Sequence, residues 1–278
     1  MSTVLGIIAG GGDLPRAVAQ SAQDGGRAVF VVGLKGSVTE DWLAAFPHAF
    51  VFLGEPGKAI TALKGAGASD VILCGRVDRP GFSELKLDTK GMMVLPKVVA
   101  AARKGDDALL RALVGIFEDD GFRAVSVAVA APGLVATEGS LGKLSPTDDN
   151  RTDIARGFAI VKALGALDVG QAAAVCDGLA LAVEAAEGTD AMIARVAGLR
   201  EALRGTPKAR RGVLVKALKP TQDAVTDMPV IGVSTVKGAA DAGLAGIAVE
   251  AGRSLILDKK AVAAEADRLG LFVIGMTP

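Results

Sequence analysis

Close to its start the chain reads Val4-Leu5-Gly6-Ile7-Ile8-Ala9-Gly10-Gly11-Gly12-Asp13-Leu14-Pro15. Residues 3–9 are aliphatic and typical of a buried strand, and residues 14–23 repeat apolar residues at helical spacing. A strand, a glycine turn and a helix begin a nucleotide-binding βαβ unit, because glycines let the backbone approach a phosphate and a helix N-terminus offers free N–H groups. We therefore predict a Rossmann-like domain at this end of the chain.

The fingerprint of a dinucleotide site is incomplete in this turn. Gly10 and Gly12 fit its first two glycine positions, but Pro15 stands where the third glycine belongs. The second predicted strand, residues 28–32, is followed by Gly33-Leu34-Lys35 and not by the acidic residue that holds an NAD ribose. This argues against a nicotinamide cofactor and leaves two alternatives, a nucleotide diphosphate site or a purely structural glycine turn.

Strands and helices continue to alternate through the first half of the chain. The pattern predicts a parallel sheet with right-handed crossovers, whose ligands collect at the carboxyl ends of the strands. After the opening strand and helix, the predicted strands are residues 28–32, 49–53, 70–74 and 123–129, and the predicted helices are residues 57–65, 92–103 and 106–120.

Two loops at those strand ends carry the candidate nucleotide-binding residues. The first holds Gly11, Gly12, Asp13 and Leu14, and the second holds Gly75 and Arg76, with Arg79 further along. The arginines would suit a phosphate or uracil contact, although Arg79 also fits a solvated loop charge. Asp13 beside a phosphate requires that it cap the helix or face a metal or a sugar hydroxyl.

The composition excludes several classes of function. Half of the 278 residues are hydrophobic and few are aromatic, which suits parallel strands buried on both faces. Lysine plus arginine and aspartate plus glutamate balance at 31 each, which is a poor basis for binding nucleic acid. No apolar run approaches the roughly 20 residues that span a bilayer, and residues 4–9 lack the basic flank of a signal peptide. We expect a cytoplasmic protein.

The scarcity of histidine limits the chemistry further. His48 is the one histidine, the chain has no tyrosine, and Cys74 and Cys176 lie in apolar contexts typical of buried free thiols. Catalytic triads and the usual zinc sites need more than this. An active site here would rely on carboxylates, lysines, arginines, backbone amides and a hard metal such as Mg²⁺.

A Gly/Pro-rich segment marks the predicted domain boundary. We place a nucleotide-binding domain at residues 1–131, a linker at 132–148 and a second, mixed α/β domain at 149–278. In the second domain, the strands 172–175 and 179–183 flank Asp177-Gly178, a strong hairpin signal. Further strands are expected at residues 212–217, 246–250, 255–257 and 271–275, and helices at 149–164, 191–203, 235–244 and 259–269.

Two acid-rich loops leave strands of this second domain. One carries Glu184, Glu187 and Asp190, and the other carries Asp223 and Asp227 between Pro220 and Pro229. We expect the two strands to be neighbours in one sheet, so that the carboxylates converge as a Mg²⁺ site requires. Alternatively, Thr189 or Asp190 merely caps the next helix and Glu187 is solvated.

Two lysines border the second acidic loop. Lys216 and Lys219 would balance the charge that develops on a pyrophosphate as its bond breaks. Proline has no N–H and a fixed φ, so Pro220 and Pro229 would hold Gln222 and the two aspartates in one shape.

Three motifs together resemble a known family across essentially the whole chain. They are residues 6–15, Gln171 with residues 180–192, and Val215-Lys216 with residues 219–223 and 227–232. The chain resembles the UDP-2,3-diacylglucosamine pyrophosphatases of lipid A biosynthesis that lack the metallophosphoesterase fold. The second and third motifs are specific, whereas the glycine turn alone is weak. One departure concerns residues 224–226, where the family commonly has an arginine, and this assigns the arginine's role to Lys216, Lys219 or Arg76.

The resemblance implies hydrolysis of UDP-2,3-diacylglucosamine to UMP and 2,3-diacylglucosamine 1-phosphate (lipid X) with Mg²⁺ or Mn²⁺. The first domain would hold UDP, and closure about the linker would enclose the substrate. Asp223, Asp227, Glu187 and Asp190 would bind the metal, while Gln222 and Thr189 would contact the substrate. A transferase or a non-catalytic binding protein for a nucleotide-linked lipid are the alternatives. We also expect transient contact with the inner face of the cytoplasmic membrane and a homodimer.

Overall fold

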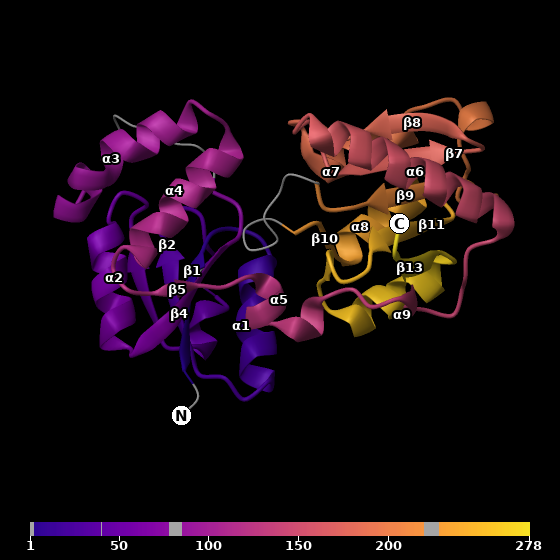
Figure 1. Ribbon diagram of the computed structural model, residues 1–278. Coiled ribbons are helices and arrows are strands. Elements are labelled where there is room, and N and C mark those ends of the chain that lie inside the picture. Colours follow the sequence, from indigo (N-terminus) through magenta and orange to yellow (C-terminus); the bar gives the residue numbers. More distant parts are fainter. Residues whose placement is uncertain (1–2, 40, 78–84, 220–227) are drawn as a thin grey trace. The chain divides into compact units, whose positions relative to one another are not determined.

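The computed structural model describes residues 3–39, 41–77, 85–219 and 228–278 (Figure 1). The chain divides into two compact units, Met1–Gly133 and Leu134–Pro278, and each unit has its own sheet and hydrophobic core. Strands and helices alternate in both units. The α/β class predicted from the sequence is therefore confirmed.

The first unit is built on a parallel sheet of order β3-β2-β1-β4-β5. Strand β1 takes the centre because its residues are buried on both faces of the sheet. The elements in chain order are β1 (Val4–Ala9), α1 (Leu14–Asp24), β2 (Val29–Leu34), η1 (Leu43–Ala45), β3 (His48–Val51), α2 (Pro56–Gly65), β4 (Ala68–Cys74), α3 (Thr89–Ala102), α4 (Asp106–Glu118), β5 (Arg123–Ala124) and α5 (Val127–Ala130).

One predicted strand of this unit is wrong. Residues 123–129 were expected to be extended, but only Arg123–Ala124 pairs with β4, and the helix α5 follows at once. Ser126 explains the change, because its side-chain hydroxyl accepts a hydrogen bond from the Val129 N–H at 3.3 Å and caps the helix. A side-chain cap therefore overrides the strand preference of the valines.

A buried carboxylate near the amino ends of the strands joins β4 to β5 and to the segment just before β2. Asp70 on β4 is 2% exposed, and its two oxygens accept hydrogen bonds of 2.8 Å from the Arg123 guanidinium. Arg27, just before β2, also donates to it. Hydrogen bonds from Arg123, and then from Arg27, hold the pKa of the Asp70 carboxyl below its usual value.

We expect Asp70→Asn to lower the free energy of unfolding of the first unit by about 2–4 kcal/mol at pH 7, because two guanidinium groups lose their charged partner. Since the folded pKa of Asp70 is depressed, its contribution is present above the unfolded value near pH 4 and is lost as the pH falls through the folded value. Urea unfolding followed by fluorescence of Trp42, the chain's one tryptophan, measures this unit.

The matched control is Asp119→Asn, since Asp119 lies on the surface and its ion pair with Lys97 is long, at 3.7 Å. It should cost no more than about 0.5 kcal/mol. A difference between Asp70→Asn and the wild type that stayed the same at pH 7 and pH 3 would contradict the charge argument.

The second unit is built on a mixed sheet of order β6-β13-β11-β9-β7-β8. Strands β9, β11 and β13 run parallel, and β7 is antiparallel to both of its neighbours. The elements are η3 (Pro132–Leu134) at the boundary, then β6 (Gly139–Ser140), α6 (Asp148–Ala166), β7 (Ala172–Cys176), β8 (Leu179–Val183), α7 (Gly188–Ala197), η4 (Glu201–Leu203), β9 (Val213–Lys216), β10 (Val230–Ile231), α8 (Val233–Asp241), β11 (Gly246–Glu250), β12 (Leu255–Ile256), α9 (Lys259–Leu269) and β13 (Phe272–Met276).

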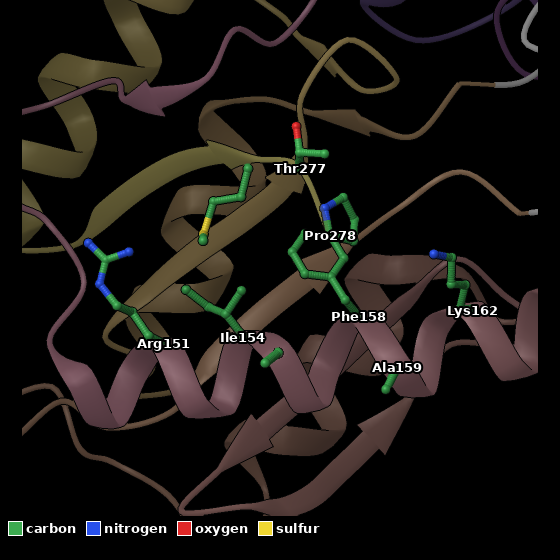
Figure 2. A pocket seen from close by; sticks show the side chains of 9 residues that line it. Arg151, Ile154, Phe158, Ala159, Lys162, Thr277 and Pro278 are labelled. Carbon is green, nitrogen blue, oxygen red and sulfur yellow. The ribbon is translucent and has the colours of Figure 1, made fainter.

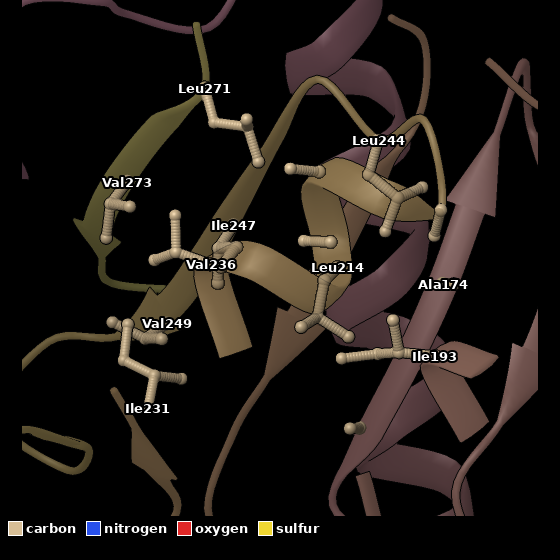
Figure 3. Close-up of a cluster of buried hydrophobic side chains, with 14 of the residues drawn as sticks. Ala174, Ile193, Leu214, Ile231, Val236, Leu244, Ile247, Val249, Leu271 and Val273 are labelled. Carbon is tan, nitrogen blue, oxygen red and sulfur yellow. The ribbon is translucent and has the colours of Figure 1, made fainter. Parts of the chain in front are cut away.

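Helices cover both faces of this sheet. Alternate strand residues point to opposite faces, so Val213 and Val215 pack with α6, whereas Leu214 packs with α7 and α8. Figure 3 shows the core on the second face, where Leu214, Ile247 and Val273 of the sheet meet helix residues such as Ile193 and Val236. The face of the sheet to which a strand residue points therefore decides which helices its side chain contacts.

The predicted hairpin is confirmed. Asp177 and Gly178 both have positive φ (50° and 75°), as a two-residue hairpin turn requires, and they join β7 to β8. The buried Asp153 carboxylate on α6 accepts hydrogen bonds from both of their N–H groups, at 3.1 and 2.7 Å. These two hydrogen bonds attach the turn to helix α6.

Two other expectations differ from the structure in detail. Most of the segment treated as a linker belongs to the second unit, since Gly139–Ser140 forms β6 and pairs with β13. A hinge at this segment stays a prediction. The helix expected at residues 191–203 begins earlier, at Gly188, and ends at Ala197, before η4. Among the described residues, no helix is both long and apolar enough to cross a membrane.

Candidate active site

The carboxyl edge of the second sheet gathers the charged residues that the strands carry at their ends. Lys216 is the last residue of β9, Glu250 is the last of β11, and Glu184 follows β8 directly. Strand β8 was expected to be a neighbour of β9, but β7 lies between them. Since β7 is antiparallel to both, β8 and β9 still end at the same edge.

A buried lysine lies at the centre of this edge. The Lys216 side chain points to the same face as Leu214 and is only 4% exposed. Its Nζ donates to Thr189 Oγ1 at 2.8 Å and to the Val230 carbonyl at 3.0 Å. The sequence prediction that placed Lys216 and Thr189 at one site is therefore consistent with direct contact between their side chains.

Glu184 completes this contact. The sequence grouped it with Glu187 and Asp190 among the acids expected to converge, but the metal ligands that the resemblance implies do not include it. Its carboxylate is 7% exposed, with Oε1 accepting from the Thr189 hydroxyl at 2.8 Å and Oε2 from the Gln171 N–H at 3.3 Å. Gly170 permits this packing, because a Cβ there would lie 2.0 Å from the Glu184 carbonyl oxygen. The signal available in the sequence was position, since Glu184 is the acid nearest to the end of β8.

Gln171 offers an acceptor at the same edge. Its side-chain Oε1 is buried and has no hydrogen-bond partner among the residues that the structure describes. Its backbone N–H and C=O are both used, by Glu184 and by the Ala217 N–H at 3.1 Å. A buried acceptor without a donor is costly, so a ligand or water donor is expected there.

The other predicted site residues have different surroundings. Glu187 is exposed and forms an ion pair with Arg195 at 2.5 Å, and Asp190 is exposed in the first turn of α7. Lys219 pairs with the exposed Asp168 at 2.8 Å. Gln222, Asp223 and Asp227 lie outside the described residues, as does Arg79.

The acids described at this edge do not form a metal site by themselves. The described part of the chain contains no group of three or more metal-binding side chains. Glu184 already accepts hydrogen bonds from Thr189 and Gln171, and Glu187 could bind a metal only if its ion pair with Arg195 were broken. The fit of a divalent ion therefore depends on Asp223 and Asp227, which carry the oxygen ligands such an ion prefers.

In the first unit, the glycine turn lies at the carboxyl edge of the parallel sheet and packs tightly against the loop after β4. Gly11 and Arg76 exchange backbone hydrogen bonds of 2.8 Å in both directions, and the Gly10 N–H binds the Cys74 carbonyl. A Cβ on Gly10 would lie 2.6 Å from the Arg76 carbonyl oxygen. Gly10 and Gly11 therefore have a structural role, and any phosphate contact by backbone N–H groups falls to Gly12, Asp13 and Leu14.

Asp13 does not cap the helix that follows it. It occupies the N-cap position of α1, but its side chain makes no capping hydrogen bond and is exposed. Of the roles that the sequence left to Asp13, a helix cap is thereby removed.

Two lysines that sequence reasoning missed lie at this same edge. Lys35 follows β2, and its Nζ lies 5.0 Å from the centre of the Phe52 ring, which follows β3. Lys86 approaches the same ring at 4.4 Å. Their positive charges suit the carboxyl edge of a sheet that receives an anionic ligand.

A shallow pocket of about 380 Å³ lies elsewhere in the second unit (Figure 2). It is lined by α6 residues, including Ile154 and Phe158, and by residues 276–278. Helix α6 covers the sheet face opposite to the one that Lys216 faces. This pocket is therefore separate from the lysine site.

The one histidine lies away from these edges, and neither cysteine has an activated thiol. His48 Nδ1 contacts the Phe46 carbonyl at 2.9 Å, at the start of the edge strand β3. Burial raises the pKa of the Cys74 thiol to about 12 and that of Cys176 to about 11. Neither thiol supplies a thiolate nucleophile near neutral pH.

Together these features define a class: a two-domain α/β protein whose strand ends present a glycine turn with cations in one unit and a buried lysine with carboxylates in the other. Models of the LpxI N-terminal domain and the LpxI C-terminal domain match residues 4–134 and 137–274. The chain belongs to the LpxI family. It is 48% identical over 274 residues to the UDP-2,3-diacylglucosamine pyrophosphatase LpxI of Caulobacter vibrioides, an alignment that covers 99% of this chain and 98% of the relative.

Proposed function

We propose that this protein hydrolyses the pyrophosphate bond of UDP-2,3-diacylglucosamine, giving UMP and 2,3-diacylglucosamine 1-phosphate (lipid X) in lipid A biosynthesis. The observation that carries this proposal is the 48% identity, through both domains, to a relative named for that activity. The buried ammonium of Lys216 at a strand-end edge supports it, since pyrophosphate cleavage develops negative charge.

The chemistry needs a water, an acceptor for its proton and stabilisation of the departing phosphate. The water oxygen forms a bond to one phosphorus, and the bond from that phosphorus to the bridging oxygen breaks. Asp223 or Asp227 orients the water and takes its proton. The ammonium of Lys216 or Lys219 stabilises charge on the pyrophosphate oxygens, and the buried Lys216 is the stronger candidate, because a charge acts more strongly where water is excluded.

A divalent cation completes the proposed site. Mg²⁺, or Mn²⁺ in its place, would be held by Asp223 and Asp227, with Glu187 and Asp190 as further oxygen ligands. Such an ion, when bound, neutralises phosphate charge. The supporting observation is the donor set, which consists of carboxylates and contains no histidine.

Substrate binding is divided between the two units in this proposal. Gly12, Asp13 and Leu14 meet the UDP phosphates at the N-terminus of α1, with Gly11, Gly75 and Arg76 shaping the turn. Gln222 contacts the substrate in the second unit, and Thr189, for which the resemblance implied a substrate contact, acts through Lys216, whose Nζ donates to its hydroxyl at 2.8 Å.

Release of UMP by the purified protein tests this function. UDP-2,3-diacylglucosamine with Mg²⁺ and no acceptor should give UMP and lipid X in equal amounts over many turnovers. UMP release only when an acceptor is added would show a transferase, and stoichiometric binding without turnover would show a binding protein. Either result would overturn the proposal.

We also propose that the protein is cytoplasmic, contacts the membrane surface and forms a homodimer. Helix α3 supports the first, because Met92 and Met93 are 58% and 67% exposed. Lys97, Arg103 and Lys104 follow on the same stretch, and residues 89–104 contain no acid. Apolar side chains beside cations are typical of helices that lie on anionic lipid.

We expect Met92→Ser with Met93→Ser to weaken binding to phosphatidylglycerol vesicles about tenfold, because two side chains that would enter the lipid become polar. Co-sedimentation with vesicles measures this. The matched control, Met92→Leu with Met93→Leu, should bind as the wild type does. Equal binding by the serine variant would contradict the lipid contact, and loss of a dimer instead would assign the face to a second copy.

A further inference from the structure

We propose that Glu184 and Thr189 are positioning residues, which hold the Lys216 ammonium in the orientation that the reaction uses. The inference rests on the proposed function, since it assumes that Lys216 acts on the pyrophosphate. The family resemblance implied that Glu187 and Asp190 are the functional acids of this loop. In the structure, however, Glu184 is the buried acid that bonds to Thr189, and Glu187 pairs with Arg195.

The hydrogen bonds have a defined direction. An ionised carboxylate can only accept, so the single hydroxyl proton of Thr189 must go to Glu184 Oε1, 2.8 Å away. The lone pairs of Thr189 Oγ1 then accept a hydrogen bond from Lys216 Nζ, which also lies 2.8 Å away, because an ammonium can only donate. The carboxylate therefore fixes the rotation of the hydroxyl, and the hydroxyl fixes the ammonium.

Four separate elements hold these three side chains. Glu184 follows β8, Thr189 lies in the first turn of α7, Lys216 ends β9, and the Val230 carbonyl of β10 accepts a further Lys216 proton at 3.0 Å. The second Glu184 oxygen is bound by the Gln171 N–H just before β7. A group anchored from so many elements keeps one geometry, which is what electrostatic stabilisation of a transition state requires.

The cost of burial also favours a functional role. Glu184 and Lys216 are both nearly inaccessible to water, and burying two charges is often less favourable than packing hydrophobic side chains in their place. The Glu184 carboxylate and the Lys216 ammonium are linked through the neutral Thr189 hydroxyl. This arrangement holds the lysine in place at the strand-end edge of the sheet.

Thr189→Val tests the inference, because valine keeps the shape of threonine and removes the hydroxyl. We expect kcat and kcat/KM for UMP release to fall together, about 10- to 100-fold, as they do when an interaction made in the transition state is lost. Thr189→Ser restores the hydroxyl and should stay within about threefold of the wild type. Melting temperatures of both variants report whether folding has changed.

A double-mutant cycle separates positioning from a general structural defect. In a Lys216→Met background, Thr189→Val should have no further effect, since there is no ammonium left to position. An equal loss in both backgrounds, or an unchanged kcat in Thr189→Val alone, would overturn the inference. The proposed function fails separately, if the wild type releases no UMP, and the role of Lys216 fails separately, if Lys216→Met keeps full activity.

Discussion

Asp223→Asn and Asp227→Asn proteins are expected to release UMP at least about a hundredfold more slowly than the wild type. Each change removes a negative charge that would bind the divalent ion or accept the proton of the attacking water. A loss of this kind corresponds to about 2–3 kcal/mol of transition-state stabilisation. Initial rates of UMP release at saturating substrate, measured over a range of Mg²⁺ concentrations, would give the effect on turnover and on the apparent metal affinity.

The control for this prediction is Glu201→Gln, which removes an exposed carboxylate from η4 in the same unit. It should leave the rate and the Mg²⁺ dependence unchanged. Circular dichroism and the melting temperature establish that the aspartate variants are folded. If folded Asp223→Asn and Asp227→Asn proteins kept full Mg²⁺-dependent activity, the proposed metal and water site would have to be abandoned.

Lys216→Met is expected to reduce kcat by about 10²- to 10³-fold, the range found when one donor to a developing oxyanion is removed. Methionine preserves the length and apolar body of the side chain, so the loss measures the ammonium. KM should change less than kcat, because the charge on the pyrophosphate grows in the transition state.

Two further lysines make this prediction specific. Lys219→Met should cost less than Lys216→Met, since Lys219 is already paired with the exposed Asp168. Lys237→Met on α8 removes an exposed charge whose ion pair with Glu265 is long, at 3.9 Å, and it should have no effect on kcat. Equal losses for Lys216 and Lys219 would show that net charge, and not the buried position, is what matters.

Much of the fold follows from local sequence patterns. Apolar runs of strand length, separated by helical periodicity, predict the α/β class of both units, and Asp177-Gly178 predicts the β7–β8 hairpin. These features depend on contacts between residues near in sequence. Residues 123–129 show where the approach fails, because the cap by Ser126 starts a helix in a stretch whose composition favours a strand.

The candidate site also has residues that the sequence indicated and residues that it did not. The sequence pointed to Lys216 because it borders the second acidic loop, and the family resemblance pointed to Thr189. Their side chains are in contact. The choice among Glu184, Glu187 and Asp190 was not accessible in this way. It depends on where α7 begins, at Gly188, because that start places Thr189 against the buried Glu184 and leaves Glu187 exposed beside Arg195.

The sequence alone therefore determined the class of fold, the family resemblance and the scarcity of histidine, since these rest on residue types and short-range spacing. Only the tertiary structure decided that β7 separates β8 from β9, that the Gly11 N–H is used by Arg76, and that Glu184 reaches Lys216 through Thr189. The physical reason is that strand order and hydrogen-bond partners are set by packing between distant segments, and spacing along the chain does not record that packing.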